Sequence, residues 1–214
     1  FASPIPPAPN LNVKAYVLMD FDSGMILASS NKDLTLPPAS ITKMMTAYLA
    51  FTELKENNVS LSEDILVSKK AWKTGGSKMF IEVGKKIKFK DILQGVITVS
   101  GNDASVALAE HISGDENTFA IYMNQKAKNI WLVNTNYTNA TGLPNDSLYT
   151  TAEDIALLSR SLISNFPDLY KLYSTKSFKF NDIKQYSRNK LLFIDDNVDG
   201  IKTGFTSAAG YCLA

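Results

Sequence analysis

The sequence predicts an α+β fold, because its strand-like segments gather near the two ends and its middle is helical. Short apolar runs joined by turn residues, which are typical of hairpins, occur over 13–28 and again over 198–214. Between them lie stretches with apolar residues at helical spacing. We therefore expect one antiparallel sheet formed by the N- and C-terminal strands, covered by helices and accompanied by a helical subregion.

The expected elements can be given in chain order. Turn residues, apolar stripes, a capping box and an Asn-Asp turn support them. They are a hairpin (13–19 with 25–28), a buried helix beginning at Ser40 and ending near 56–58, a flexible loop (73–77), a small basic hairpin around Gly84 (81–89), helices over 91–99, 104–112 and 117–131, a loop (134–149), a helix opened by a Thr150–Glu153 capping box, a hairpin around Asn181-Asp182, and two strands within 198–214.

The composition limits the possible functions. The 214 residues are 45% hydrophobic, enough for one substantial core, and the net charge of +1 supplies no global field for nucleic acid or an anionic membrane. The single histidine, His111, excludes a histidine-based metal cluster, and the single cysteine, Cys212, excludes an internal disulfide. No apolar run reaches the roughly 18 residues of a membrane span. We expect no metal, no cofactor and no nucleic-acid partner.

The two ends of the chain suggest how the domain is bounded. Residues 1–12 are rich in proline and alanine and lack an initiator methionine, as in a linker or a mature terminus left after removal of an export signal. We expect an extended leader over 1–12 and one domain over 13–214. Because the chain stops within its last expected strand, we also expect this domain to be truncated at its C-terminal end.

The first candidate motif is Ser40-Ile41-Thr42-Lys43, at the mouth of the expected buried helix. Ser40 and Lys43 are three residues apart and share a face of the first turn. The helix macrodipole disfavours a cation there by about 0.3–1 kcal/mol, and desolvation lowers the pKa of an amine further. A neutral Lys43 can take the proton of Ser40 and activate it as a nucleophile. The alternative is an N-capping serine beside a solvated lysine. The same spacing recurs at Ser29/Lys32 and Ser187/Lys190, but neither copy opens an apolar helix.

Two later motifs are candidates for the same cleft. Ser100-Gly101-Asn102 interrupts two apolar helices, although helix termination and capping explain this turn equally well. In Lys202-Thr203-Gly204, the lysine can protect a strand edge, whereas glycine in a strand often marks the close approach of another backbone. A second Lys-Thr-Gly, at Lys73, lies in a glycine-rich loop ahead of the serine turn and lacks the strand context.

The order of these motifs resembles that of the penicillin-recognising serine enzymes. From Val13 to the last residue, the sequence is similar to the D-alanyl-D-alanine carboxypeptidases among the low-molecular-mass penicillin-binding proteins. Glycine at position 101, where many β-lactamases have aspartate, favours this branch. The segments that carry the resemblance are 15–20, 38–45, 100–104, 188–192 and 198–204.

The resemblance implies a β-lactamase/transpeptidase-like fold and a set of site residues. Ser40 would attack the carbonyl between two D-alanines and form an acyl-enzyme that water then hydrolyses, with Lys43 as the base. Ser100 would relay a proton, and Asn102 would form hydrogen bonds to Lys43 and to the substrate amide. Lys202 would lower the pKa of Lys43, and it would bind the substrate carboxylate together with Thr203, Gly204 and Arg188. The backbone N–H groups of Ser40 and Phe205 would form the oxyanion hole. Phe205 stands where relatives often have histidine, so we expect only its backbone to act.

The resemblance also implies partners and location. The partners would be peptidoglycan stem peptides ending in D-Ala-D-Ala and β-lactam antibiotics. The protein would be exported to the periplasm or the outer face of the bacterial cytoplasmic membrane, with membrane association only through segments absent from this chain. Three alternatives stay open: a serine β-lactamase, although no Glu-x-x-x-Asn element is evident in 134–149, a non-catalytic β-lactam sensor or wall-binding module, and a transpeptidase.

Overall fold

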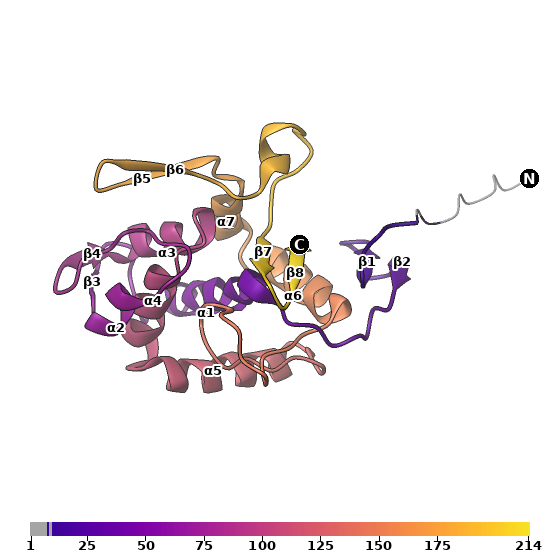
Figure 1. Cartoon of the computed structure of the whole chain (residues 1–214), viewed down its shortest axis with the longest axis horizontal. Coiled ribbons are helices and arrows are strands. Elements are labelled where there is room, and N and C mark those ends of the chain that lie inside the picture. Colours follow the sequence, from indigo (N-terminus) through magenta and orange to yellow (C-terminus); the bar gives the residue numbers. More distant parts are fainter. Residues whose placement is uncertain (1–7, 9) are drawn as a thin grey trace, which may run out of the picture.

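Helices and short hairpins surround one central helix (Figure 1). The structure, a computed structural model, describes residue 8 and residues 10–214, so most of the expected leader 1–12 lies outside the described residues. The elements are β1 (Tyr16–Met19), β2 (Ile26–Ser30), the 3₁₀ turn η1 (Ala39–Thr42), α1 (Lys43–Lys55), β3 (Asp64–Leu66), α2 (Lys69–Lys73), β4 (Lys86–Lys88), α3 (Phe89–Thr98), α4 (Asn102–Ser113), α5 (Glu116–Asn129), α6 (Ala152–Asn165), α7 (Pro167–Tyr170), η2 (Lys171–Ser174), β5 (Ser177–Phe180), β6 (Ile183–Tyr186), η3 (Lys190–Phe193), β7 (Thr203–Thr206) and β8 (Gly210–Leu213).

Helix α1 is the centre of the hydrophobic core. Every residue from Lys43 to Thr52 is buried, as expected for a helix that is apolar on nearly every side. Helices α3, α4, α5 and α6 all pack against it, and Figure 1 shows it running between them. The first residue of this buried helix is a lysine, so the fold places an amine inside the core.

Ser40 lies in the 3₁₀ turn η1 and not in the α-helix that the sequence predicts to begin there. The preceding residue, Ala39, has a left-handed backbone with φ of 48°, a conformation that is strained for a residue with a Cβ. Because a 3₁₀ helix has about three residues per turn, side chains at positions i and i+3 lie above one another. The tighter turn therefore aligns Ser40 with Lys43.

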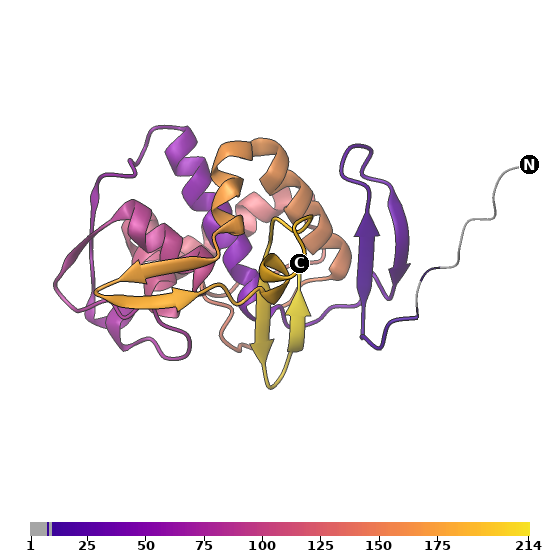
Figure 2. The same cartoon turned by 90° about the horizontal axis from the view of Figure 1, so that it is seen from above.

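The strands form four separate two-stranded antiparallel sheets among the described residues. The α+β class is confirmed, but the expected single sheet joining both ends is not present: β1–β2 and β7–β8 stand apart (Figure 2). Ala214 and Lys202 exchange hydrogen bonds within the C-terminal hairpin, and the other edge of β8 pairs with no strand of the described residues. A groove of about 900 Å³, lined by both hairpins and by α6, separates β8 from β1.

The basic hairpin predicted for 81–89 is wrong. Strand β4 pairs instead with β3, which lies more than twenty positions earlier in the sequence. The register places Ile65 opposite Ile87, and both side chains are buried beneath the lysines and other exposed residues of these strands. Burial of this apolar pair thus outweighs the local turn signal at Gly84.

The other helices and hairpins that the sequence predicts are present, whereas α2 and α7 are not predicted by it. Helices α3, α4 and α5 match the expected segments within a few residues. The turn of the β5–β6 hairpin has positive φ at both Asn181 and Asp182, as a two-residue hairpin turn requires. The cap of α6 is shifted by one position: Thr151 accepts from the N–H of Asp154.

The shifted cap has a tertiary cause. Glu153, the expected partner in the capping box, instead forms an ion pair with Lys32, with a distance of 2.5 Å between Nζ and Oε2. Its backbone N–H also donates to the carbonyl of Lys32.

None of the helices built by the described residues has the length and apolar character needed to cross a bilayer.

Candidate active site

The Lys43 amine has three hydrogen-bond partners at the start of α1. Its Nζ lies 3.2 Å from Ser40 Oγ, 2.6 Å from Asn102 Oδ1 and 2.5 Å from the backbone oxygen of Thr141. The partners come from η1, the start of α4 and the loop before α6. Two motifs that are 59 positions apart in the sequence therefore meet at one nitrogen, as predicted for Lys43 and Asn102.

This arrangement fixes the direction of the lone pair when the amine is neutral. A neutral amine has two hydrogens and one lone pair. The amide oxygen of Asn102 and the carbonyl of Thr141 can only accept, so each takes one hydrogen. The remaining direction, toward the Ser40 hydroxyl, then holds the lone pair. In that state Ser40 donates its proton to the nitrogen, which is the geometry a general base needs.

Burial and charge favour the neutral amine. The Lys43 side chain is almost completely buried. Its pKa is well below its usual value, chiefly because burial removes water from the charged form, and then because of the positive charge of Lys202. The buried carboxylate of Asp103 acts in the opposite direction and raises this pKa. Desolvation has the largest effect, which is the cause expected from the sequence.

The Asn102 side chain has a defined orientation. Its Nδ2 donates to the carbonyl of Gly75 at 2.7 Å, so its oxygen faces Lys43. Its backbone N–H donates to the carbonyl of Ser77 at 2.7 Å. A Cβ on Gly76 would lie 2.5 Å from the Asn102 nitrogen, so glycine is required there. The loop over 73–77, which the sequence indicates only as flexible, thus packs directly against the site.

Ser100 lies in the turn between α3 and α4, two residues before Asn102. Its backbone is left-handed, with φ of 61°, which is uncommon for a serine and costs about 1–3 kcal/mol. Its hydroxyl is buried and, among the residues that the structure describes, has no hydrogen-bond partner. A buried hydroxyl without a partner remains available to a ligand. The proton-relay role expected for Ser100 stays a prediction.

Strand β7 passes directly over Ser40. A Cβ built on Gly204 would lie 3.0 Å from the Ser40 backbone nitrogen and 3.2 Å from the Ala39 side chain. The close backbone approach expected from a glycine in this strand is therefore present. It brings Lys202, Thr203 and Gly204 to the same region as Ser40 and Lys43.

Lys202 is a second buried lysine, and its Nζ donates to the carbonyl of Thr203 at 2.9 Å. Burial, together with the positive charge of Arg188, lowers the pKa of Lys202 to about 7. Arg188 itself is exposed on the loop after β6. The next residue, Asn189, is buried and donates to the carbonyl of Gly200 at 2.8 Å, which ties this loop to the segment leading into β7.

The backbone N–H groups of Ser40 and Phe205, which the resemblance assigns to the oxyanion hole, have no acceptor within their own elements. Ser40 is in the first turn of η1, where amides have no acceptor within the helix. In the β7–β8 ladder, Lys202 and Ala214 exchange hydrogen bonds, so the alternation leaves the pair Phe205 and Tyr211 without ladder bonds. The Phe205 N–H consequently points away from β8. The Phe205 ring is exposed and lies 4.7 Å from the ring of Tyr211.

Three residues of the site have no role assigned to them from the sequence. Thr141 supplies a backbone oxygen, and every residue has one, so its type gives no signal. Gly142 packs so closely on Ala39 that a Cβ would lie 1.8 Å from the Ala39 oxygen. Asp103 accepts backbone bonds from Met79 and Phe80, both at 2.9 Å. The signals that point to them are the Gly142 turn in an otherwise ordinary loop and an acidic residue directly after the Ser-Gly-Asn motif.

The site contains no metal-binding cluster in the part of the chain that the structure describes. No group of three or more His, Cys, Asp or Glu side chains there is arranged to hold a metal ion. The polar groups around Ser40 are an amine, an amide, hydroxyls and backbone donors. This donor set is suited to nucleophilic acyl transfer, in which a serine attacks a carbonyl and backbone amides stabilise the oxyanion.

Comparison with known proteins confirms the expected resemblance. Residues 3–214 match peptidase family S11, the D-alanyl-D-alanine carboxypeptidases. The chain is 44% identical over 209 residues to the D-alanyl-D-alanine carboxypeptidase DacA of Haemophilus influenzae, covering 96% of this chain and 53% of that protein. It thus spans about half the length of the curated relatives it matches.

Solved structures share the fold. The crystal structure of the carboxypeptidase DacD from Francisella tularensis has a TM-score of 0.95 and 38% identity, covering 98% of this chain and 63% of that one. Penicillin-binding protein D2 from Listeria monocytogenes, in its ampicillin-bound form, has a TM-score of 0.83 and 30% identity, with 96% and 85% covered. Two separated motifs meet at one buried amine and a third packs against Ser40. With this geometry, and with similarity along nearly its whole length, the chain belongs to the D-alanyl-D-alanine carboxypeptidase family.

Proposed function

We propose that this protein is a serine D-Ala-D-Ala carboxypeptidase that removes the terminal D-alanine from peptidoglycan stem pentapeptides through an acyl-enzyme. The observation that carries the proposal is the contact of 3.2 Å between Lys43 Nζ and Ser40 Oγ, made by an amine whose other two partners only accept hydrogen bonds. The family membership and the low pKa of Lys43 support it. Residues 13–214 would form the penicillin-binding domain.

In the acylation step, Ser40 Oγ attacks the carbonyl carbon between the two D-alanines while Lys43 takes its proton. The oxygen of that carbonyl becomes negative and is held by the backbone N–H groups of Ser40 and Phe205; losing one such donor typically costs about 10²–10³ in rate. The carbon–nitrogen bond then breaks. The proton returns to the leaving amine through Ser100, and D-alanine departs.

Substrate recognition would depend on the strand β7 side of the site. The terminal carboxylate of the substrate is an anion, and we assign its binding to the buried Lys202, the Thr203 hydroxyl and the exposed Arg188, whose charge acts on Lys202. Gly204 has no side chain to fill the gap between β7 and Ser40. Asn102 has a second Nδ2 hydrogen, which can be donated to the substrate amide. Binding of the carboxylate would raise the pKa of Lys202 above its value of about 7 in the free protein.

Water completes the reaction by hydrolysing the ester of the acyl-enzyme, which regenerates Ser40. β-Lactams would acylate the same hydroxyl, since their strained amide offers the same carbonyl chemistry. The ampicillin-bound form of the Listeria protein supports this expectation. Because the substrate is part of the bacterial wall, the enzyme would act after export, in the periplasm or on the outer face of the cytoplasmic membrane.

The proposal is tested by mass spectrometry after exposure to penicillin. The unmodified protein should gain the mass of one penicillin on the peptide that contains Ser40. Ser40→Ala should gain none, while its thermal unfolding stays close to that of the parent, because Ser40 is only partly buried. Labelling that persists in Ser40→Ala would refute the nucleophile.

The alternatives give different results in the same preparation. A β-lactamase would release hydrolysed penicillin quickly and leave no long-lived adduct. A sensor or wall-binding module would be labelled by penicillin but would release no D-alanine from a pentapeptide. A transpeptidase would form a cross-linked product when an amine acceptor is added.

A further inference from the structure

The loop from Thr138 to Leu143 determines where one partner of Lys43 lies. Its Thr141 carbonyl accepts from Lys43 Nζ at 2.5 Å. Together with Asn102, this carbonyl directs the lone pair of the amine toward Ser40. Asn102 is anchored by the loop over 73–77. The Thr141 carbonyl has no regular helix or strand to hold it, so its position depends on the side chains that brace the loop.

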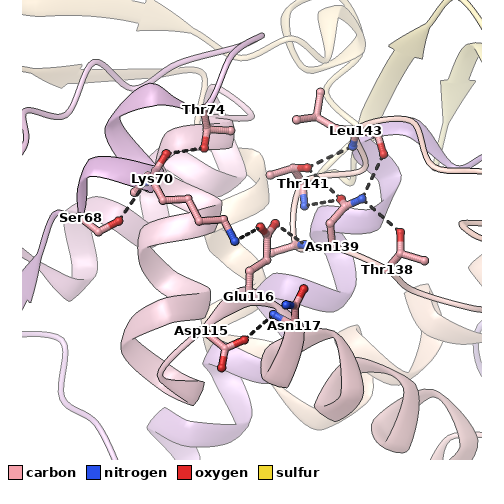
Figure 3. Close-up of polar contacts among 12 residues, drawn as sticks. Ser68, Lys70, Thr74, Asp115, Glu116, Asn117, Thr138, Asn139, Thr141 and Leu143 are labelled. Atoms are coloured by element: carbon pink, nitrogen blue, oxygen red, sulfur yellow. Dashed lines mark hydrogen bonds and ion pairs between the residues drawn. The ribbon is translucent and has the colours of Figure 1, made fainter.

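Asn139 makes most of those contacts. Its Oδ1 accepts from Thr141 N at 3.1 Å, from Thr141 Oγ1 at 2.9 Å and from Gly142 N at 2.7 Å. Its Nδ2 donates to Leu143 O at 3.1 Å and to Thr138 Oγ1 at 3.2 Å. Figure 3 shows the Asn139 amide enclosed by these groups. One side chain therefore binds the backbone on both sides of the Thr141 carbonyl.

Glu116, the first residue of α5, supports the loop from outside. Its Oε1 accepts from the Ala140 backbone N–H at 3.2 Å. Its Oε2 forms an ion pair with Lys70 of α2 at 2.8 Å, as Figure 3 shows. The glutamate side chain is mostly shielded from solvent, with 13% exposed. The loop is thus fixed to two helices by Glu116 and held in its turn by Asn139.

We infer that Asn139 is a positioning residue for the general base: it orients the Thr141 carbonyl, which in turn orients the Lys43 amine. The inference rests on the proposed function, because it concerns the same serine and lysine. Asn139 does not touch Ser40 or Lys43 through a hydrogen bond and acts through the loop that carries the Thr141 carbonyl. A displacement of about 1 Å at a reacting group can lower a rate by about 10²-fold.

The test measures the rate constant of acylation by a fluorescent penicillin in three variants. Asn139→Ala removes all five hydrogen bonds. Asn139→Asp keeps the accepting oxygen and loses the two donated bonds. Asn145→Ala is the matched control, since Asn145 lies two residues beyond this loop, before α6, and among the described residues its side chain accepts only from Ser147 N. Each rate is expressed per molecule that finally becomes labelled, so that unfolded protein does not contribute.

We expect Asn139→Ala to acylate about 10- to 100-fold more slowly than the parent, Asn139→Asp to lie between them, and Asn145→Ala to match the parent. An Asn139→Ala rate within threefold of the parent, or an equal loss in Asn145→Ala, would overturn the inference. If Asn139→Ala does not fold, Asn139→Leu decides in its place, because leucine keeps the size of the side chain and makes none of the five hydrogen bonds; an unchanged acylation rate would overturn the inference. Failure of the proposed function is a separate result, in which the parent protein itself is not labelled at Ser40.

Discussion

Gly142 offers the sharpest test of how the active site is assembled. The residue has φ of 81°, and a Cβ built on it would lie 1.8 Å from the Ala39 oxygen and 2.4 Å from the Ala39 carbonyl carbon. Side-chain carbons in real proteins keep at least 3.0 Å from such atoms. In Gly142→Ala, the loop and the Ala39–Ser40 backbone must therefore separate by more than about 1 Å, a displacement that can cost about 10²-fold in rate.

A matched control separates this clash from backbone strain. Gly114 has a similar φ of 82°, but its Cβ would meet nothing within 4 Å. An alanine at either position must adopt a positive φ, which costs about 1–3 kcal/mol. At about 2–4 °C per kcal/mol for a chain of this size, Gly114→Ala should lower the melting temperature by a few degrees and leave acylation unchanged.

The assay compares both variants by thermal unfolding and by the acylation rate with a fluorescent penicillin. Gly142→Ala should unfold at a lower temperature than Gly114→Ala and should acylate about 10²-fold more slowly. The carbonyl of Thr141 moves with Gly142, so the lone pair of Lys43 loses its direction toward Ser40. Equal acylation rates in the two variants would show that the close packing of Gly142 on Ala39 does not position the catalytic groups.

Two further predictions concern buried charge. Lys202→Met removes a positive charge that lowers the pKa of Lys43, so this pKa should rise. Because the acylation rate grows as Lys43 loses its proton, the acid limb of the acylation–pH profile should move to higher pH. Lys202→Arg, which keeps the charge, should move this limb less. Asp103→Asn removes the charge that raises the same pKa, so the limb should move to lower pH. It also weakens the bonds from Met79 and Phe80 and should cost about 1–3 kcal/mol in unfolding free energy. Acylation rates measured across pH give the shift of the limb, and chemical denaturation gives the change in unfolding free energy. Movement of the limb in the same direction for Lys202→Met and Asp103→Asn would contradict the electrostatic account.

The sequence predicts most of the helices because their apolar spacing is a local signal. It also predicts the central buried helix, where the apolar residues cover nearly every side. It fails at β4, since the pairing of Ile87 with Ile65 depends on a contact far away in the chain. It fails likewise at the cap of α6, because Glu153 is drawn to Lys32, which no local pattern indicates.

The site was predictable where the chemistry resides in side chains. Ser40, Lys43 and Asn102 are reactive or polar residues at unusual places, and the structure brings them together within hydrogen-bond distance. Lys202 and Gly204 were predictable as a strand motif, and the structure places Gly204 against Ser40. The catalytic and binding roles of these residues remain predictions until the variants are measured.

The sequence by itself determined the reactive side chains, most of the longer helices and the α+β class, since these follow from residue type and periodicity. Only the tertiary structure decided how the Lys43 amine is oriented toward Ser40. The Thr141 carbonyl, the Asn139 turn and the loop carbonyl at Gly75 are all needed to orient Lys43 and Asn102. Backbone oxygens occur at every residue and leave no trace in composition or spacing, so their use as acceptors emerges only when distant segments pack together.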